Sequence, residues 1–454
     1  MSSEANGNGS PTGPTVPSDP SATVSLYGSS RPDAAAFRVY RDPDLYEAEQ
    51  ERIFRGPVWS YLGLEAEVEK AGDFKSSFIG EIPVVLCRGA EGALHAWVNR
   101  CAHKGALVCR ANRGNTKDGS FVCVYHQWAY NAAGDLIGVP FRRGLNGVGG
   151  YPAEFKLKDH GLEKLRVASV AGMVFATLNA EAPALEEFLG QRMCANIRRV
   201  LHRPIRILGY ARQHMRGNWK LYAENSRDSY HGGLLHLFYP TFGIYRQSQD
   251  SRGEVDEQGF HNLFTVFKPS TDVAYSSYSQ EARREMAGVQ RLQDPRVIEY
   301  RPDIGDNIAL SIQSLFPSVV LQQIQNTLAT RQVLLKGVDT TELLWTYFGF
   351  ADDDAEMTQH RLRNINLVGP AGFISMEDGE AVEICQRGTN GSEGVSSYIA
   401  MSGTEVAQEV SPIGMDENAV RGFWKGYWAL LRGQVQGGMS ASARARTVPQ
   451  GEAR

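Results

Sequence analysis

The spacing of hydrophobic positions changes near residue 168, and the change predicts two kinds of structure. Between Pro57 and Val167, short apolar runs such as "IPVVLC" and "ALHAWV" are separated by glycine-containing turns, a pattern typical of a compact all-β module. Beyond it, helical patterns alternate with longer apolar runs, which are "LGYARQHMR", "SVVLQQIQ", "ATRQVLL" and "ELLWTYFGF". These four runs are consistent with strands of one antiparallel sheet, so the pattern predicts an α+β chain.

Two helices are predicted near the ends of this pattern. Between Asp42 and Phe54 the segment "DPDLYEAEQERIF" places apolar residues among good helix formers after an Asp-Pro start. The second helix is marked by an apolar stripe at three- and four-residue steps, formed by Val420, Phe423, Trp424, Tyr427 and Leu431. Such an amphipathic helix can pack its apolar face on the sheet.

The length of the chain and its polar ends suggest several regions. The first thirty residues are rich in Ser, Gly, Pro and Thr, a composition that predicts disorder. A chain of 454 residues exceeds what one hydrophobic core usually holds. We therefore expect a disordered tail at 1–33, a helical segment at 34–55, the β module at 56–170, a larger domain at 171–440 and a flexible tail at 441–454.

Composition and charge exclude several classes of partner. The net charge of -4, from 47 basic and 51 acidic residues, gives no electrostatic reason to expect nucleic acid or an anionic membrane. No apolar run approaches the roughly 18 residues of a membrane span, and the N-terminus lacks the pattern of a signal peptide. Six cysteines over this length do not resemble a disulfide scaffold. We expect a cytoplasmic protein, in which a regular Cys and His pattern indicates a metal site.

Such a pattern occurs in the β module. Cys101 and His103 form C-x-H, and Cys123 and His126 follow after 19 residues as C-x2-H. Four ligands of this kind could hold a structural zinc. Each half offers one Cys and one His, however, which suits a Rieske [2Fe–2S] cluster with two Cys on one iron and two His on the other. The remaining cysteines, Cys87, Cys109, Cys194 and Cys385, are interpreted as buried or incidental thiols.

A second concentration of ionisable residues is the segment "ENSRDSYHGGLLH" at residues 224–236. On an unbroken helix His231 and His236 would lie roughly 140° apart, so we expect Gly232 and Gly233 to bend the chain and turn both rings toward one point. Asp228 and His231 would share a face of the preceding turn. Two convergent imidazoles indicate a metal, although two His five residues apart are by themselves also compatible with ordinary packed or surface histidines.

Longer strings around these residues carry a family resemblance. The runs "CAHKGALVC" and "CVYHQWAYNAAGDLIGVPF" resemble the cluster loops of Rieske oxygenases, and "ENSRDSYHGGLLH" resembles their mononuclear iron motif. From about Tyr40 to the terminal helix the chain resembles the large (α) subunits of Rieske non-heme iron aromatic-ring-hydroxylating oxygenases. It is most similar to the branch of salicylate 5-hydroxylase, anthranilate dioxygenase and terephthalate dioxygenase, as in "GLEAEV", "GVPFRRG", "GNWKLYAEN", "LLHLFYPTFG" and "NLVGPAGFISMEDGE".

The resemblance implies a fold and a complete set of metal ligands. The fold is an all-β Rieske domain inserted into a helix-grip catalytic domain, in which an antiparallel sheet wraps a long helix. The iron would be Fe(II), bound by His231, His236 and a carboxylate from "LVGPAGFISMEDGEAVEICQRG" at residues 367–388. The alignment places that carboxylate at Asp378, with Glu377 as the alternative. Together they would form a 2-His-1-carboxylate triad with one open face.

Other residues receive roles from the same resemblance. Asp228 would bridge two subunits by bonding His126 of a neighbour and His231 or His236 of its own chain. The alternative is a carboxylate that only fixes one imidazole. Asn225 and Tyr230 are expected near the iron or in the scaffold. Lys104 stands where the family more often has Arg, which keeps the charge but loses the planar fork.

The resemblance also implies a reaction and partners. Electrons from NAD(P)H would arrive through a reductase, with or without a ferredoxin, and O2 would attack an aromatic ring. A homotrimer or an α3β3 assembly with a small β subunit is implied. Monohydroxylation, dihydroxylation of the terephthalate or halobenzoate type, and decarboxylating hydroxylation all remain open. Two other classes are a Rieske electron carrier without catalysis, which would not need the further 250 or so residues, and a structural zinc protein.

The run "ATRQVLL" indicates the substrate. Arg331 shares one side of the predicted strand with Ala329, Val333 and Leu335, and an arginine on an apolar face is costly unless it is paired. It could form a salt bridge with a nearby acid. Alternatively it faces a cavity and binds a substrate carboxylate, which the resemblance supports. Arg421 is a second candidate, and Val368 and Ile374 are expected in the apolar wall.

Overall fold

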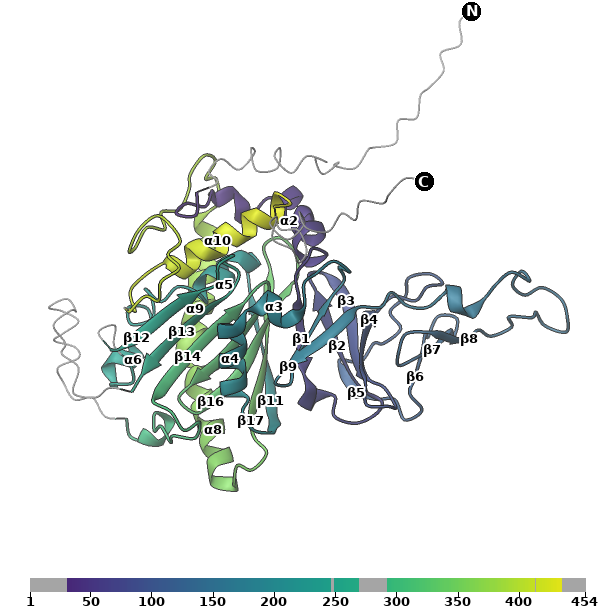
Figure 1. Ribbon diagram of the computed structural model, residues 1–454, viewed down its shortest axis with the longest axis horizontal. Helices are drawn as coiled ribbons and strands as arrows, with labels where there is room; N and C mark the ends of the chain where they lie inside the picture. The colour runs from purple at the N-terminus through teal and green to yellow at the C-terminus, as the bar shows by residue number, and fades with distance from the viewer. Residues whose placement is uncertain (1–30, 246–248, 269–291, 413, 435–454) are drawn as a thin grey trace, which may run out of the picture.

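The computed structural model describes residues 31–245, 249–268, 292–412 and 414–434 (Figure 1). The N-terminal tail expected to be disordered lies almost entirely outside these residues, and the expected C-terminal tail lies wholly outside them. No helix within the described ranges is long and apolar enough to cross a membrane.

The larger part of the molecule is built on a seven-stranded antiparallel sheet of strand order β11-β17-β16-β15-β14-β13-β12. Its strands are β11 (Ile205–Met215), β12 (Ser251–Val255), β13 (Asn262–Phe267), β14 (Ile308–Leu315), β15 (Val319–Ile324), β16 (Thr327–Leu335) and β17 (Thr341–Phe350). The four apolar runs predicted to share one sheet are β11, β15, β16 and β17. This prediction is confirmed, and the register places Arg331 between Val320 on β15 and Trp345 on β17.

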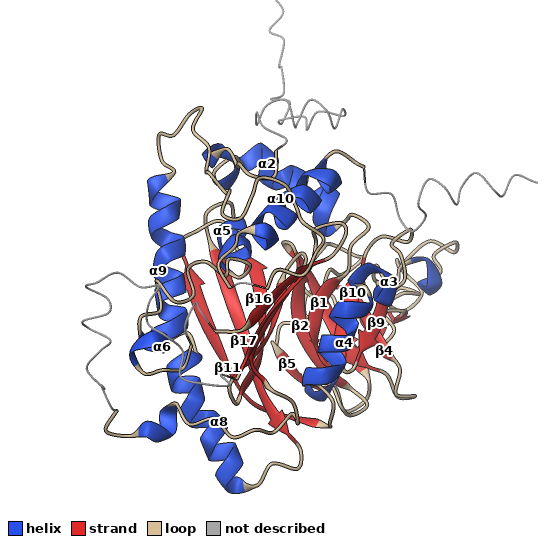
Figure 2. Cartoon of the chain, turned by 60° about the vertical axis from the view of Figure 1, so that its left-hand side comes forward, coloured by secondary structure: helices blue, strands red, loops and turns tan. Residues whose placement is uncertain are grey.

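Helices pack around this sheet (Figure 2). They are α2 (Pro43–Glu49), α3 (Leu185–Leu189), α4 (Gln191–Val200), α5 (Trp219–Asn225), α6 (Phe238–Thr241), α8 (Ala355–Val368), α9 (Phe373–Gly388) and α10 (Asn418–Leu431). Figure 2 shows α8 and α9 running along one side of the sheet, with α5 and α10 near its upper end. The predicted N-terminal helix is α2, continued by a π-helical turn at Gln50–Phe54, and the predicted terminal helix is α10.

The predicted all-β module is also confirmed, and it consists of three small sheets. The first contains β1 (Ser60–Leu64), β10 (Met173–Thr177) and β9 (Arg166–Val170). The second contains β4 (Leu94–Val98), β3 (Ile82–Arg88), β2 (Asp73–Ile79) and β5 (Arg113–Asn115). The third contains β6 (Ser120–Val122), β7 (Ala129–Asn131) and β8 (Leu136–Gly138), and it projects farthest from the large sheet (Figure 1).

Short 3-10 turns occur at four places along the described chain, at Phe37–Tyr40, Glu65–Glu67, Leu157–Asp159 and Pro295–Val297.

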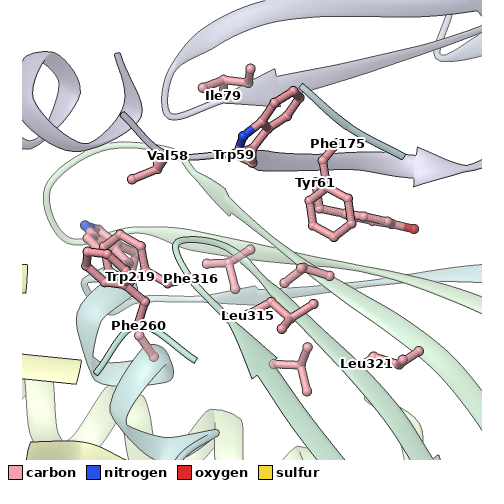
Figure 3. Close-up of a cluster of buried hydrophobic side chains, with 14 of the residues drawn as sticks. Val58, Trp59, Tyr61, Ile79, Phe175, Trp219, Phe260, Leu315, Phe316 and Leu321 are labelled. Atoms are coloured by element: carbon pink, nitrogen blue, oxygen red, sulfur yellow. The ribbon is translucent and has the colours of Figure 1, made fainter. Parts of the chain in front are cut away.

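A continuous apolar core joins the module to the large sheet. Figure 3 shows Tyr61 and Phe175 of the module on the side facing Leu315 and Leu321 of the large sheet. The Tyr61 hydroxyl lies 3.0 Å from the Thr330 hydroxyl on β16. The first sheet of the module therefore packs against the large sheet, while its third sheet stays free of it (Figure 1).

A buried carboxylate links three helices near the site. Glu49, at the end of α2, accepts hydrogen bonds from Lys220 Nζ (2.6 Å) and Trp219 Nε1 (2.7 Å) on α5 and from the Tyr427 hydroxyl (2.6 Å) on α10. Glu49 and Lys220 are fully buried. Because α5 leads directly into residues 226–236, this group fixes the helix that carries the candidate site.

Candidate active site

The two predicted iron-binding histidines lie just beyond α5. Asn218 caps the start of this helix by accepting a hydrogen bond from Lys220 N (3.0 Å), and the helix ends at Asn225. His231 and His236 therefore lie in turns, and their ring centroids are 5.2 Å apart. Neither Gly232 nor Gly233 adopts a positive φ. Both rings lie beyond the end of the helix, and Gly232 and Gly233 belong to the turn between them, as expected.

Asp378, on the buried side of α9, completes a three-residue group. Its Oδ1 lies 3.4 Å from His231 Nε2 and 3.2 Å from His236 Nε2. One ligand atom from each of the three residues lies within 4.8 Å of the others, a geometry that could hold a metal ion. Glu377 lies on the far side of His236, where its Oε2 accepts a hydrogen bond from His236 Nδ1 (2.7 Å). The geometry thus groups both histidines with Asp378.

The pKa values of His231 and Asp378 are shifted in opposite directions, and both shifts favour positive charge beside the carboxylate. Burial would lower the pKa of His231, but hydrogen bonds to Asp228 and Asp378 outweigh it and raise the pKa to about 10. Burial would raise the pKa of Asp378, but the two histidines hold it well below its usual range. Asn225 also donates from Nδ2 to Asp378 Oδ1 (3.1 Å). A buried carboxylate between two imidazoles is a site that a divalent cation can occupy in place of protons.

A cavity of about 90 Å³ opens beside this group. Its wall contains the three candidate ligands together with Asn225 and Arg331. The rest of the wall is mostly apolar or aromatic and includes Tyr239, Tyr245, Phe264, Leu310, Ile312, Ile324 and Ile374. The predicted wall residue Ile374 therefore lines the cavity. The wall also contains Ser226, Arg227, Asp228 and Ser229, so it combines apolar surface with a few polar and charged groups, as small-molecule sites do.

Arg331 is buried, with 5% of its surface exposed, at one end of the cavity. Its Nε donates to Gln322 Oε1 (2.6 Å), as does Nη2, and its Nη1 donates to the Tyr222 hydroxyl (3.1 Å). The guanidinium lies over the ring of Trp345, 4.6 Å from its centroid. Within the described part of the chain Arg331 forms no ion pair, so the salt bridge considered from the sequence is not found there.

Two other predicted substrate residues lie away from the cavity wall. Val368, the last residue of α8, is buried behind the wall, where its carbonyl accepts a hydrogen bond from the Ser375 hydroxyl (2.8 Å). Arg421 on α10 donates to the backbone carbonyls of Glu405, Ile399 and Met401. Neither residue is among the described residues that line the cavity: Val368 packs in an apolar cluster, and Arg421 is bound by backbone carbonyls.

Asp228 lies in the walls of two cavities, the one beside the candidate metal group and a second one. Its Oδ1 accepts from the backbone N–H of Tyr230 (2.7 Å), and its Oδ2 lies 3.4 Å from His231 Nδ1. The second cavity, of about 210 Å³, is lined by Asp228 together with Glu224 and Glu417. Asp228 thus contacts a candidate ligand and also lines the second cavity.

In the β module, the Cys and His residues lie on two adjacent loops. Cys101 and Cys123 are buried, whereas His103 and His126 are partly exposed above them, with ring centroids 4.4 Å apart. The Cys101 sulfur lies 3.2 Å from the Tyr130 hydroxyl. His103 Nδ1 is buried and has no partner, as expected of a nitrogen that binds a metal. Two inner sulfurs and two outer imidazoles fit a [2Fe–2S] cluster of the Rieske type.

The remaining features of the loops are compatible with that assignment. All six cysteines of the chain are free; Cys87, Cys109 and Cys194 are buried and Cys385 is exposed. Lys104 places its ammonium over the ring of Tyr125, 5.8 Å from the centroid. At this position the cation stacks on an aromatic ring, so the charge is kept without an arginine fork.

The sequence did not indicate the residues that hold Arg331 in place. Gln322, Tyr222 and Trp345 belong to three different elements, and only the register and the packing of α5 under the sheet bring them together. The one available signal was the polar pair in "LQQIQ", since glutamine in a fully buried strand needs a partner.

An all-β module with paired Cys and His loops, joined to a sheet domain with a three-ligand group, defines a redox enzyme with two metal centres. Comparison with known proteins gives the family. The family model described as "Rieske [2Fe-2S] domain" matches residues 58–152. The model described as "Ring hydroxylating alpha subunit (catalytic domain)" matches residues 203–433. The chain belongs to the α subunits of the Rieske aromatic ring-hydroxylating oxygenases.

Individual relatives agree with this assignment. The chain is 46% identical to the anthranilate 1,2-dioxygenase large subunit of Burkholderia cepacia over 87% of this chain and 92% of the relative. It is also 46% identical to a terephthalate 1,2-dioxygenase terminal oxygenase subunit of Comamonas sp., over 88% and 96%. The large oxygenase component of salicylate 5-hydroxylase from Ralstonia sp. is 39% identical over 93% and 98%.

The fold is shared with solved structures. The crystal structure of naphthalene 1,2-dioxygenase from Rhodococcus sp. superimposes with a TM-score of 0.74, covering 88% of this chain and 95% of that one at 23% identity. The expected α+β architecture, with a β-sheet Rieske domain and a catalytic domain built on a large antiparallel sheet, is thereby confirmed.

Proposed function

We propose that this α subunit hydroxylates an aromatic carboxylate similar to salicylate or anthranilate, with O2 as oxidant. Fe(II) would be held by His231, His236 and Asp378, and the Rieske cluster by Cys101, His103, Cys123 and His126. Three relatives whose names refer to anthranilate, terephthalate and salicylate support an acid as substrate.

The observation that carries this proposal is the position of Arg331. A guanidinium has five N–H donors, and the three bonds to Gln322 and Tyr222 leave two available. The fork geometry of arginine matches a carboxylate with two parallel hydrogen bonds. A buried cation that faces a cavity and lacks an anion among the described residues is stabilised when the substrate supplies one.

The protein residues then position the ring beside the metal. Arg331 would hold the carboxylate at one end, while apolar side chains such as Ile312 and Ile374 exclude water around the ring. Asn225 would orient Asp378, and Glu377 would hold the His236 ring through Nδ1. When bound, the cluster supplies electrons and the iron supplies the O2 chemistry.

Electron delivery would involve other chains. The third sheet of the β module projects away from the large sheet (Figure 1), and the turn between its strands β6 and β7 carries Cys123 and His126, while Cys101 and His103 follow β4. A cluster held there would serve a neighbour's iron better than its own. We assign Asp228 as the link between His126 of one subunit and His231 of the next within a homotrimer or α3β3 ring with a small β subunit. Electrons from NAD(P)H would reach the cluster through a reductase, with or without a ferredoxin.

The test is a substrate panel with the reconstituted oxygenase and its electron donors. O2 uptake and products, identified by mass spectrometry, are compared for salicylate, anthranilate, terephthalate, naphthalene and toluene. We expect at least one acid to be oxidised with coupled O2 uptake and both hydrocarbons to react poorly. Equal turnover of hydrocarbons and acids would contradict the proposal. The same products separate monohydroxylation from the dihydroxylation of the terephthalate or halobenzoate type.

A further inference from the structure

A separate cavity of about 190 Å³ adjoins the substrate cavity. Among the described residues the two cavities share three wall residues, Tyr245, Leu310 and Ile324, so these side chains lie at the boundary between them. The outer cavity, which we call the outer chamber, lies between residues 242–245 after α6, the ends of β13 and β14, and residues 298–300. None of its described wall residues belongs to the candidate metal group.

Lys268 is the one charged side chain in the described wall of the outer chamber. Its Nζ donates to the backbone carbonyl of Asp306 (2.9 Å) and lies over the ring of Tyr300, 4.9 Å from the centroid. The Asp306 carboxylate is held instead by Arg199, at 2.6 and 2.9 Å. Lys268 forms no ion pair with a described acid, and an ammonium with three donors keeps two for another acceptor.

We propose that the outer chamber is a transient binding site for the carboxylate of the incoming substrate, with Lys268 as the group that receives it. The inference rests on the proposed function. A carboxylate that leaves water for an apolar cavity loses hydration, and a cation in the wall of the outer chamber offsets part of that loss. The acid then moves past Tyr245, Leu310 and Ile324 to Arg331.

The two cations differ in a way that suits a transfer. Lys268 offers a mobile point charge, which binds a carboxylate without fixing its orientation. Arg331 offers a rigid fork, held by Gln322 and Tyr222, which fixes both oxygens. The inner site is therefore the more specific of the two, and an acid leaves the outer chamber toward it.

The experiment compares Lys268→Met and Lys268→Arg with wild type, using an acid that wild type oxidises and the corresponding neutral amide. For Lys268→Met we expect kcat/KM for the acid to fall about tenfold, kcat to stay within twofold, and the amide to be unaffected. Lys268→Arg should recover most of the loss. Added salt should lower kcat/KM of wild type but hardly affect Lys268→Met, because salt screens the attraction between the half-buried ammonium and the approaching carboxylate.

The control is Lys336→Met, since Lys336 lies over the ring of Phe78, outside both cavities, and should leave every constant unchanged. An unchanged kcat/KM in Lys268→Met would overturn the inference, as would an equal loss of kcat. A loss confined to dicarboxylates would overturn it too, because Lys268 would then hold a second carboxylate during the reaction. If wild type oxidises no aromatic acid at all, the proposed function fails instead.

Discussion

At the scale of single residues, Glu377 and Asp378 are neighbours in sequence but occupy opposite positions around His236. Asp378 faces the His Nε2 atoms, whereas Glu377 accepts from His236 Nδ1. Asp378→Ala should abolish the binding of mononuclear iron and product formation while leaving the red-brown cluster, as measured by iron analysis and visible absorbance. Retained iron in this variant, together with iron loss in Glu377→Ala, would show that Glu377 is the ligand.

Glu377 should act on the metal through His236. Removing a carboxylate that orients a metal-binding histidine typically costs 10- to 100-fold in metal affinity. We expect a loss of about this size in Glu377→Ala, measured as the Kd of Fe(II) for the iron-depleted protein. In Glu377→Gln the amide oxygen can still accept from Nδ1, so most of the affinity should return. Wild-type affinity in Glu377→Ala would mean that the contact does not position the ring.

The residues of the candidate site were predictable to different degrees. His231, His236 and Asp378 stand in continuous motifs, so the sequence alone named a group that the geometry brings together. Arg331 was noticed because a cation on an apolar strand is anomalous. Arg421 was noticed for the same reason, but it donates to backbone carbonyls on a neighbouring loop. The periodic pattern of apolar residues in the sequence cannot predict such a contact.

At the scale of elements, the Glu49 group should hold α2, α5 and α10 together. Burial lowers the pKa of Lys220, whereas the charge of Glu49 and its hydrogen bond act to raise it. Glu49→Ala leaves a buried ammonium unpaired and should cost about 3–5 kcal/mol in the free energy of unfolding, measured by denaturant titration. Arg198→Ala, which breaks an exposed pair with Glu186, should change the free energy of unfolding far less. Equal costs would show that the group is not a structural link.

Glu224 on α5 makes the stability of the same region depend on pH. Burial raises the pKa of Glu224 to about 7 from an ordinary value of 4.5, although a hydrogen bond from Tyr40 lowers it. Between these values the unfolded chain has lost a proton that the folded chain keeps, so the free energy of unfolding falls as pH rises. Glu224→Gln removes this term. Its Tm should exceed that of wild type at pH 8, and the gap should close toward pH 4.5.

The control for this prediction is the shape of the two Tm curves. A wild-type Tm parallel to that of Glu224→Gln from pH 4.5 to pH 8 would contradict a raised pKa. The change should be modest, since each kcal/mol shifts Tm by roughly 2–4 °C in domains of 150–250 residues.

Elements with a strong period were predicted well from the sequence. The four apolar runs and the stripe of α10 gave strands and a helix in the right places. Helices α8 and α9 were not identified as such, because their buried faces include polar residues, for example His360, Arg361 and Asn364 on α8. The contacts with other elements that satisfy these buried polar groups form only in the folded chain, so the sequence pattern does not reveal them.

At the scale of the whole molecule, the proposed electron path runs between subunits. Asp228→Ala should leave cluster reduction and bound iron largely intact while coupled turnover falls below about a tenth of wild type, a barrier increase of more than roughly 1.4 kcal/mol. Stopped-flow reduction of the cluster and product yield measure the two steps separately. Turnover above that level would assign Asp228 only to orienting His231.

Mixed oligomers test the path without altering Asp228. His126→Ala should lose the cluster and Asp378→Ala the iron, so each alone is inactive. When the two chains assemble together, about a quarter of the iron sites should have an intact iron in one chain and an intact cluster in its neighbour. Activity should return to about that level. An inactive mixture whose co-assembly is shown by differently tagged chains would place the path within one chain.

The central claim, that a buried arginine selects an aromatic acid, is tested most directly by the specificity of Arg331→Leu. The quantity is the ratio of kcat/KM for the preferred acid to kcat/KM for its neutral amide, measured by coupled product formation, with iron and cluster content confirmed for each protein. We predict that the ratio falls at least about 100-fold in Arg331→Leu, equivalent to roughly 2.7 kcal/mol, and is only partly restored in Arg331→Lys. An unchanged ratio in Arg331→Leu would contradict the account.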